Sequence, residues 1–432
     1  MDSEPAPPAA PPTFHEALRF WWKLGLISFG GPGGQIALMH EEVVRRKRWI
    51  GEERFLHALS VCHLLPGPEA QQLSIYLGWL LHGTRGGLVA GTLFVLPSAL
   101  LLWILSWVYA THGQLPWIRS AFLGLQAAVL AILLSAVLRI GKTVLTSPLG
   151  GGLVLAGALL MPLRIPFPVL LLGAALVGVA VSRVVPRWFP PAAVPASEGL
   201  ESLHRERSAV RSLGLLLLGL VLWWGPVVLL GLWLGWSHVL VEQGLFFGKA
   251  AMLTFGGAYA ILPYVSQQAV EHFHWLTASQ MLDGLGLAET TPGPLIMVLQ
   301  FVGFLGAWRD PEPGSPLLAG TLGAAITTWT TFVPSFLWIL LGAPYVERIR
   351  RKATLATAFR AISATVFGTL LFFFVTLGRD ILIPQGRPVQ VAGILLSVLA
   401  WLALRFGKWS LPLLVLSAAT AGVLSHLLRS GG

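Results

Sequence analysis

Cysteine and charged residues are both scarce in this sequence. One of the 432 residues, Cys62, is a cysteine, and only 11% of the residues are charged. A single cysteine excludes an internal disulfide and a cysteine-based metal cluster. Hydrophobic residues make up 55% of the chain and the mean hydropathy is +0.73, so there is too little polar surface to cover a soluble globule of this length. The composition predicts an integral membrane protein without a metal or other cofactor.

Motifs of catalysis and of nucleic-acid binding are missing as well. The chain has no GxSxG and no HExxH string, and His57 and His63 have no evident partner for hydrolytic chemistry. The formal charge of +10 comes from Lys and Arg residues that lie between apolar segments, without interleaved aromatic residues. An intramembrane enzyme is the alternative from another class, but we expect neither an enzyme nor a nucleic-acid partner.

Long apolar segments recur along the chain, which predicts membrane-spanning helices, because a barrel would show short alternating strands. Residues 1–12 carry neither a basic start nor an apolar core, so we expect a flexible tail and not a signal peptide. The predicted fold is all-α, with nine segments that span the lipid bilayer: 85–111, 117–141, 148–163, 167–184, 212–236, 317–342, 354–378, 388–405 and 411–428.

An internal repeat divides the chain, because several features recur at one constant offset, the one that separates Lys23 from Lys249. We interpret this as a duplication. The predicted division is a first repeat at 13–190, a basic linker with one extra transmembrane helix at 191–239, and a second repeat at 240–432. The other recurring features are Phe29-Gly30-Gly31 with Phe255-Gly256-Gly257, Trp49 with Trp275, and Pro66-Gly67-Pro68 with Pro292-Gly293-Pro294.

The basic residues predict that the two repeats have opposite orientations in the membrane. Arg45-Arg46-Lys47-Arg48 follows the first FGG motif, whereas Glu271-His272-Phe273-His274 occupies the same place in the second repeat. In the next pair of equivalent loops the distribution of basic residues is reversed, since 111–116 in the first repeat has none and 348–352 in the second repeat has four. Cytoplasmic loops are enriched in Lys and Arg, so the pattern predicts inverted repeats with a cytoplasmic amino terminus and an external carboxyl terminus.

The FGG and PGP motifs are expected to break helices at membrane depth, because proline lacks an amide donor and glycine is a poor helix former. Such breaks are tolerated only where protein or water covers the freed backbone groups. A half-helix that begins at a break directs unpaired amides and the positive end of its dipole at the midplane, which suits an oxyanion. We expect re-entrant hairpins, although the sequence also allows these segments to span.

Candidate site residues follow from these breaks. Lys23 and Lys249 are symmetric cations for an anion, or they extend to the membrane interface. Gln72 and Gln300 supply neutral hydrogen bonds or serve in packing, and Glu69 and Glu289 lie beside the PGP breaks as candidates for proton coupling. The full substrate-binding set is Lys23, Phe29, Gly30, Gly31, Pro66, Gly67, Pro68, Gln72, Lys249, Phe255, Gly256, Gly257, Pro292, Gly293, Pro294 and Gln300.

These motifs carry a resemblance to a known family. The stretch from FGGPGGQIALMHEEVVRRKRW to LLPGPEAQQLSIYLG, followed by LPS, resembles the first domain of the chromate ion transporter family, and FGGAYAILPYVSQQ to ETTPGP is similar to its second domain. The resemblance implies a two-domain protein that exports chromate from the bacterial cytoplasm across the plasma membrane, coupled to the proton gradient. Ala258 departs from the pattern where the first copy has Pro32, so the halves would contribute unequally.

Other transport functions stay open at this level. Chromate is a tetrahedral dianion shaped like sulfate, so the same scaffold would suit an importer of sulfate or of another oxyanion. A passive anion channel would use the same half-helix site. A homodimer is also compatible with the sequence.

Overall fold

The computed structural model describes residues 12–163, 165–190, 209–255, 257–312, 314–342, 353–383, 390–407 and 409–430, and helices are the regular secondary structure of these ranges. The prediction of an all-α integral membrane protein is confirmed. The first half contains α1 Phe14–Ile27, α2 Gly31–His40, the π-helix η1 Glu41–Arg46, α3 Glu52–Cys62, α4 Glu69–His112, α5 Pro116–Val144, α6 Pro148–Leu160, the 3-10 helix η2 Met161–Leu163 and α7 Phe167–Val184.

The second half follows the connecting helix α8 Ala209–Leu234. It contains α9 Val239–Leu253, α10 Ala258–Gln267, the π-helix η4 Gln268–His272, α11 Ala278–Thr290, the 3-10 helix η5 Leu295–Met297, α12 Val298–Arg309, α13 Pro316–Leu337, the π-helix η6 Trp338–Gly342, α15 Ala353–Leu382, α16 Val391–Arg405 and α17 Leu411–Ser430. Most of the predicted tail, the first part of the predicted linker and the basic residues of 348–352 lie outside the described residues.

Each of the nine predicted spans coincides with a helix. In the described part of the chain, six helical segments are long and apolar enough to cross a membrane; they lie in α4, α5, α7, α8, α13 with η6, and α15. The other three predicted spans correspond to the shorter apolar helices α6, α16 and α17. Helix α4 is two helices joined at a kink at His82 and Gly83, so only its second part corresponds to the predicted span 85–111.

The helices of the first half recur in the second half in the same order. Helices α1, α2, η1 and α3 correspond, at the constant offset of the repeat, to α9, α10, η4 and α11. Both η1 and η4 are π-helices, and the second residue after each is a non-glycine residue with positive φ, Arg48 at 52° and His274 at 55°. The same local backbone irregularity therefore occurs at matched positions in both halves.

The glycine motifs end helices where the sequence predicted breaks. Helix α1 ends at Ile27, and α2 begins at Gly31 after Gly30, whose φ is 99°. At the PGP motifs φ is 127° at Gly67 and 107° at Gly293, in the left-handed range that favours glycine. A helix of 14 residues such as α1 is about 21 Å long, which is shorter than a hydrocarbon core of about 30 Å.

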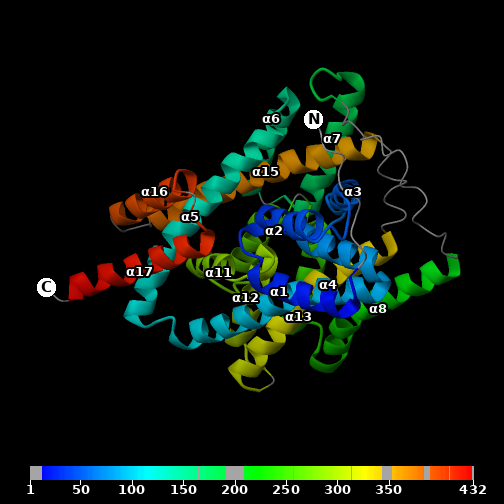
Figure 1. The fold of residues 1–432 in the computed structure, drawn as a ribbon. Helices are drawn as coiled ribbons and strands as arrows, with labels where there is room; N and C mark the ends of the chain where they lie inside the picture. The colour runs from blue at the N-terminus through cyan, green and yellow to red at the C-terminus, as the bar shows by residue number, and fades with distance from the viewer. Residues whose placement is uncertain are drawn as a thin grey trace.

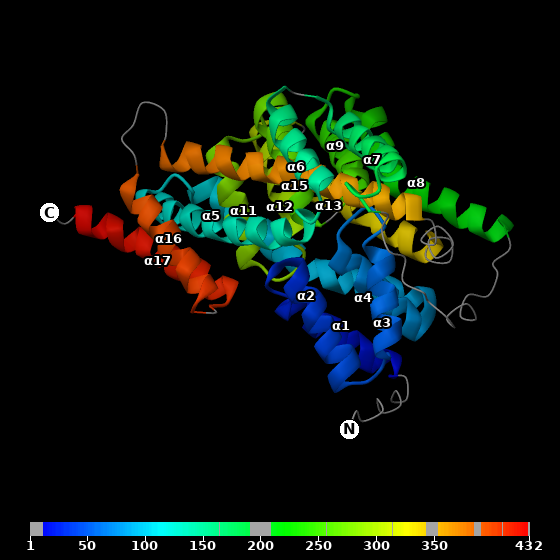
Figure 2. The ribbon, with the colours of Figure 1, turned by 90° about the horizontal axis from the view of Figure 1, so that it is seen from above.

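The long helices form a scaffold around these broken segments. Helix α15 packs against α5, α6 and α7, while α5 also packs against α16 and α17. Helices α8 and α17 lie at opposite ends of the molecule in both views (Figures 1 and 2), and Figure 2 shows α1, α2 and α3 on the side opposite α9. Large apolar side chains of α8 are exposed, among them Leu229 at 67% and Trp233 at 71%. These exposed apolar surfaces suit contact with lipid.

Candidate functional site

The breaks of the two halves pair with each other through two backbone hydrogen bonds. The amide of Gly67 donates to the carbonyl of Thr254 over 2.8 Å, and the amide of Gly293 donates to the carbonyl of Ser28, also over 2.8 Å. Gly67 corresponds to Gly293, and Ser28 to Thr254, at the constant offset of the repeat. The PGP motif of each half is therefore bonded to the residue that precedes the FGG motif of the other half, and we call this place the crossing.

Two buried glutamine side chains satisfy carbonyl groups that the breaks leave free. The Nε2 atom of Gln35 donates to the carbonyls of Ser28 and Gly293, and Nε2 of Gln72 donates to the carbonyl of Pro66 over 2.7 Å. Both glutamines are fully buried. Such partners are necessary at membrane depth, because an unsatisfied carbonyl in an apolar medium costs several kcal/mol. Gln72, a candidate from the sequence, thus lies at the crossing, and it stabilises the broken backbone.

Two serine hydroxyls at the crossing have no hydrogen-bond partner among the described residues. Ser98 and Ser335 are both fully buried, and their Oγ atoms are unpaired. A methyl group added to Gly67 would lie 2.9 Å from the Ser335 Oγ, and one added to Gly293 would lie 3.0 Å from the Ser98 Oγ. Each hydroxyl therefore lies against the PGP glycine of the opposite half and is free to donate a hydrogen bond to an anion. The LPS motif that contains Ser98 was recognised in the sequence, but neither Ser98 nor Ser335 was predicted as a site residue.

An arginine and a tyrosine lie near the amino end of α2. A methyl group on Gly33 would lie 3.5 Å from Nη1 of Arg139, and one on Gly31 would lie 3.8 Å from the Tyr259 hydroxyl. The Tyr259 hydroxyl donates to Oε1 of Glu289 over 2.7 Å. Arg139, on α5, interacts electrostatically with Glu289. Arg139 was not predicted from the sequence, although a charged residue near the end of an apolar span is the kind of signal that finds such a group.

Glu69 lies at the amino end of α4, close to the amino end of α10. Its carboxylate is 3.5 Å from Nε2 of His63, with side-chain exposures of 14% for Glu69 and 49% for His63. A methyl group on Gly257 would lie 3.9 Å from Oε1 of Glu69. The carboxylate therefore lies where the positive end of the α10 dipole attracts an anion.

The remaining predicted residues are distributed around the crossing and away from it. Lys23 on α1 and Lys249 on α9 are both exposed. Gln300 links three helices, since its Nε2 donates to the carbonyl of Ala99 over 2.8 Å and its Oε1 accepts from Thr328 over 3.0 Å. Gly256 lies outside the described residues. The predicted residues that the breaks themselves contain are Phe29, Gly30, Gly31, Pro66, Gly67, Pro68, Phe255, Gly257, Pro292, Gly293 and Pro294.

A further buried carboxylate connects α11 to the scaffold. Asp283 accepts hydrogen bonds from the Tyr109 hydroxyl over 2.7 Å and from Nε2 of Gln126 over 2.8 Å. Asp283 is 5% exposed and occupies the place that His57 has in the first half. Asp283 was not predicted from the sequence, because its partners on α4 and α5 are distant in sequence.

Comparison with known proteins finds relatives along nearly the whole chain. The family profile described as chromate transporter matches twice, at residues 15–179 and 241–423. A chromate transport protein of Pseudomonas aeruginosa is 32% identical over 98% of this chain and 94% of its own length. A chromate transport protein of Cupriavidus metallidurans is 29% identical over 96% of this chain and 94% of its own length. An uncharacterized transporter of Methanocaldococcus jannaschii is 25% identical over 93% and 92%.

No solved structure matches the chain. The family consists of transport proteins, which confirms the predictions of a transporter and of a chain that is not an enzyme. The repeated match and the near-complete coverage agree with the resemblance found in the sequence motifs. With its two matched regions, this multi-pass membrane protein belongs to the chromate transporter family.

Proposed function

We propose that this protein is a secondary transporter that exports chromate from the bacterial cytoplasm across the plasma membrane. The observation that carries the proposal is the crossing, where the PGP glycine of each half is bonded to the break of the other half. Broken segments from two matched sequences meet there, which is the arrangement of many secondary transporters.

The crossing supplies the groups that a tetrahedral dianion requires. The hydroxyls of Ser98 and Ser335 have no partner in the part of the chain that the structure describes and can donate, and Arg139 places a guanidinium near the amino end of α2. Hydrogen bonds to charged groups are stronger than neutral ones, and an arginine fork matches the geometry of paired oxygens. A sulfate-like oxyanion has the same charge and shape, so we include it as a competing substrate.

Proton coupling in this proposal depends on carboxylates that compete with the substrate. Glu69 lies beside Gly257 at the amino end of α10, where its charge occupies a place that suits an oxyanion. Glu289 lies near Gly31 through its hydrogen bond with Tyr259. Two anions repel each other in an apolar site, so the protonation of a carboxylate would depend on whether substrate is bound, and this dependence would link proton movement to chromate movement.

The proposal includes inverted repeats, with the amino terminus in the cytoplasm and the carboxyl terminus outside. The matched π-helices at 41–46 and 268–272 and the reciprocal bonds of the crossing support a pseudo-two-fold relation between the halves. The basic run at 45–48 supports a cytoplasmic location for that end of the first repeat.

Chromate accumulation by inside-out vesicles tests this function directly. We expect accumulation against a chromate gradient when a proton gradient is imposed, and we expect sulfate to inhibit it. Flux that only follows the chromate gradient would favour a passive channel. Absence of chromate flux in vesicles that contain folded protein would contradict the proposed substrate.

The variants Ser98→Ala and Ser335→Ala link the function to the crossing. Each removes one unpaired hydroxyl from a fully buried position while keeping the Cβ atom. Loss of one hydrogen bond to a charged ligand corresponds to roughly a tenfold or larger rise in KM. Unchanged kinetics in both variants would contradict substrate binding at the crossing.

A further inference from the structure

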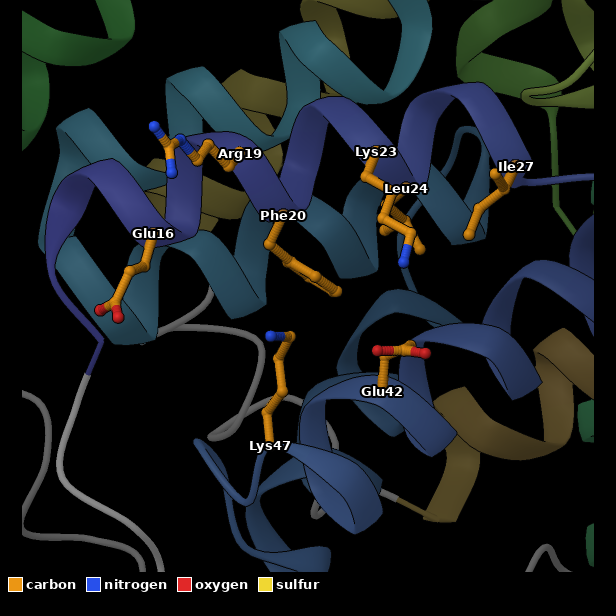
Figure 3. Close-up of a pocket in the computed structure, with 8 residues that line it drawn as sticks. All are labelled: Glu16, Arg19, Phe20, Lys23, Leu24, Ile27, Glu42 and Lys47. Carbon is orange, nitrogen blue, oxygen red and sulfur yellow. The ribbon is translucent and has the colours of Figure 1, made fainter.

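A basic pocket opens beside the first broken helix, between α1 and η1. Its volume is about 280 Å³, and its wall is formed by one side of α1 together with Glu42 of η1 and Lys47, the residue that follows η1. Figure 3 shows Lys23 and Lys47 extending toward the space between the two elements from opposite sides. The lining residues are Glu16, Arg19, Phe20, Lys23, Leu24, Ile27, Glu42 and Lys47.

The acidic residues of this pocket already have partners. Glu42 accepts from Nη1 of Arg46 over 2.9 Å, outside the pocket lining. The Glu16 carboxylate accepts from the backbone amide and the hydroxyl of Thr13, which forms the capping box of α1. These neutral donors orient the carboxylate and leave its charge, which interacts with Lys47. Within the described ranges, Arg19 and Lys23 form no ion pair, so their charges are available to an anion.

The second half replaces two of the three basic groups of this pocket, Arg19 and Lys47, with apolar ones, whereas Lys23 corresponds to Lys249. Nζ of Lys47 lies 4.7 Å from the centre of the Trp49 ring, whereas its counterpart Phe273 is stacked on Trp275 at 4.3 Å with an interplanar angle of 7°. The counterpart of Arg19 is Leu245. An aromatic stack therefore occupies the place where the first half has a cation. The asymmetry assigns the pocket to the side of the protein that carries Arg45 to Arg48, which we call the basic side.

The pocket also leads toward the crossing. Its lining runs along α1 from Glu16 in the first turn to Ile27, the last residue of the helix. Ser28 follows immediately, and its carbonyl accepts from the amide of Gly293. An anion held beside Ile27 would therefore be next to the break where α1 ends.

We infer that this pocket is a loading site, where an incoming divalent oxyanion is captured by Arg19, Lys23 and Lys47 before it reaches the crossing. The inference rests on the proposed function. It names a second site for the same substrate, on the side of the first half that carries the run Arg45 to Arg48. An anionic lipid headgroup has the same phosphate-like chemistry, and the test below separates the two sources.

The test measures KM and the maximal rate of chromate uptake into proteoliposomes in the orientation that exposes the basic side. Arg19→Gln and Lys47→Gln each remove one charge from the pocket wall. A cation about 5 Å from a dianion in solvated surroundings attracts it, and after screening by salt this attraction corresponds to about three- to tenfold tighter binding. We expect KM to rise by that factor while the maximal rate changes by less than twofold.

Arg45→Gln is the matched control. Arg45 is exposed on η1 and does not line the pocket, so this variant loses the same charge from the same side of the protein. Lys47→Arg keeps the charge beside Trp49 and is expected to keep KM near that of the wild type, which separates loss of charge from loss of packing. If Arg45→Gln raises KM as much as the pocket variants do, the attraction is a general surface effect and the loading site is wrong.

Lipid composition decides between substrate and headgroup. The measurements are made in phosphatidylcholine vesicles with and without phosphatidylglycerol. If the pocket variants raise KM equally in both kinds of vesicle, the result supports substrate capture. If KM rises only in vesicles with phosphatidylglycerol, the pocket is a lipid site and the loading site is overturned. Normal KM in Arg19→Gln and Lys47→Gln, with active wild-type protein, overturns the loading site alone, whereas absent flux in the wild type counts against the proposed function.

Discussion

Gly293 makes the reciprocal pairing of the two halves sensitive to a single methyl group. Its φ is 107°, and its amide donates to the carbonyl of Ser28. In Gly293→Ala the new Cβ would lie 2.6 Å from the Cβ of Ser98 and 3.0 Å from its Oγ. Real Cβ atoms do not approach one another so closely, so α4 and the PGP segment must separate.

Two physical effects add in this variant. A non-glycine residue in a sparsely populated backbone region costs roughly 1–3 kcal/mol, and overpacking of a dense interior costs about 1–3 kcal/mol more. Separation also lengthens the hydrogen bond to Ser28 and moves the unpaired Ser98 hydroxyl. The two costs together predict a destabilisation of roughly 2 to roughly 6 kcal/mol. We also expect loss of most chromate transport.

The assay combines thermal stability of the detergent-purified protein with transport in proteoliposomes. Gly152→Ala is the control, because Gly152 lies within α6 and a Cβ there meets no atom within 4 Å. That change is expected to be neutral or to stabilise by about 0.5–1 kcal/mol. If Gly293→Ala matches Gly152→Ala in stability and transport, the close approach at the crossing is wrong.

A second substitution separates the steric effect from the backbone effect. Ser98→Gly removes the atoms that collide, after which the nearest contact of the new methyl is the Phe94 carbonyl at 3.7 Å. We expect Gly293→Ala to cost less in the Ser98→Gly background than in the wild type, by about 1–3 kcal/mol. Additive effects would contradict a direct contact between these two residues.

The remaining predictions concern topology, substrate charge and coupling. In a Cys62→Ala background, Arg45→Cys and Glu271→Cys lie at matched exposed positions and should react with an impermeant thiol reagent from opposite sides of the membrane; labelling from one side contradicts inversion. Arg139→Gln should raise KM for chromate about tenfold or more, with partial recovery in Arg139→Lys, and unchanged KM would remove Arg139 from the site. Glu69→Gln should retain downhill chromate flux but lose its dependence on the proton gradient, and retained dependence would exclude this carboxylate from coupling.

Local sequence patterns predicted the helices and their breaks. Hydropathy located helices at all nine predicted spans, and the FGG and PGP motifs located the ends of α1, α9, α3 and α11. This succeeded because both signals depend on residues within a few turns: the length of an apolar segment and the missing amide or side chain of proline and glycine. The kink in α4 at Gly83 was not predicted, since one glycine in an apolar segment is compatible with a continuous helix.

The candidate site was predicted only in part. The sequence identified the PGP and FGG motifs, Gln72, Glu69 and Glu289, all of which lie at or beside the crossing. Lys23 and Lys249 were chosen for their symmetry; both are exposed, and Lys23 lines the pocket between α1 and η1 instead of the crossing. Charge and symmetry do not show which side of a helix faces the centre, because that depends on the rotation of the helix against its neighbours.

By itself the sequence determined the membrane class, the repeated motifs and the positions of the breaks, because these follow from hydropathy, identity at a fixed offset and the backbone chemistry of glycine and proline. Only the tertiary structure decided that Gly293 is bonded to Ser28, that Ser98 and Ser335 lie against the opposite motif with no partner among the described residues, and that Arg139 reaches α2. These contacts join residues far apart in the chain. Their distances result from how the long helices pack, and no local pattern contains that information.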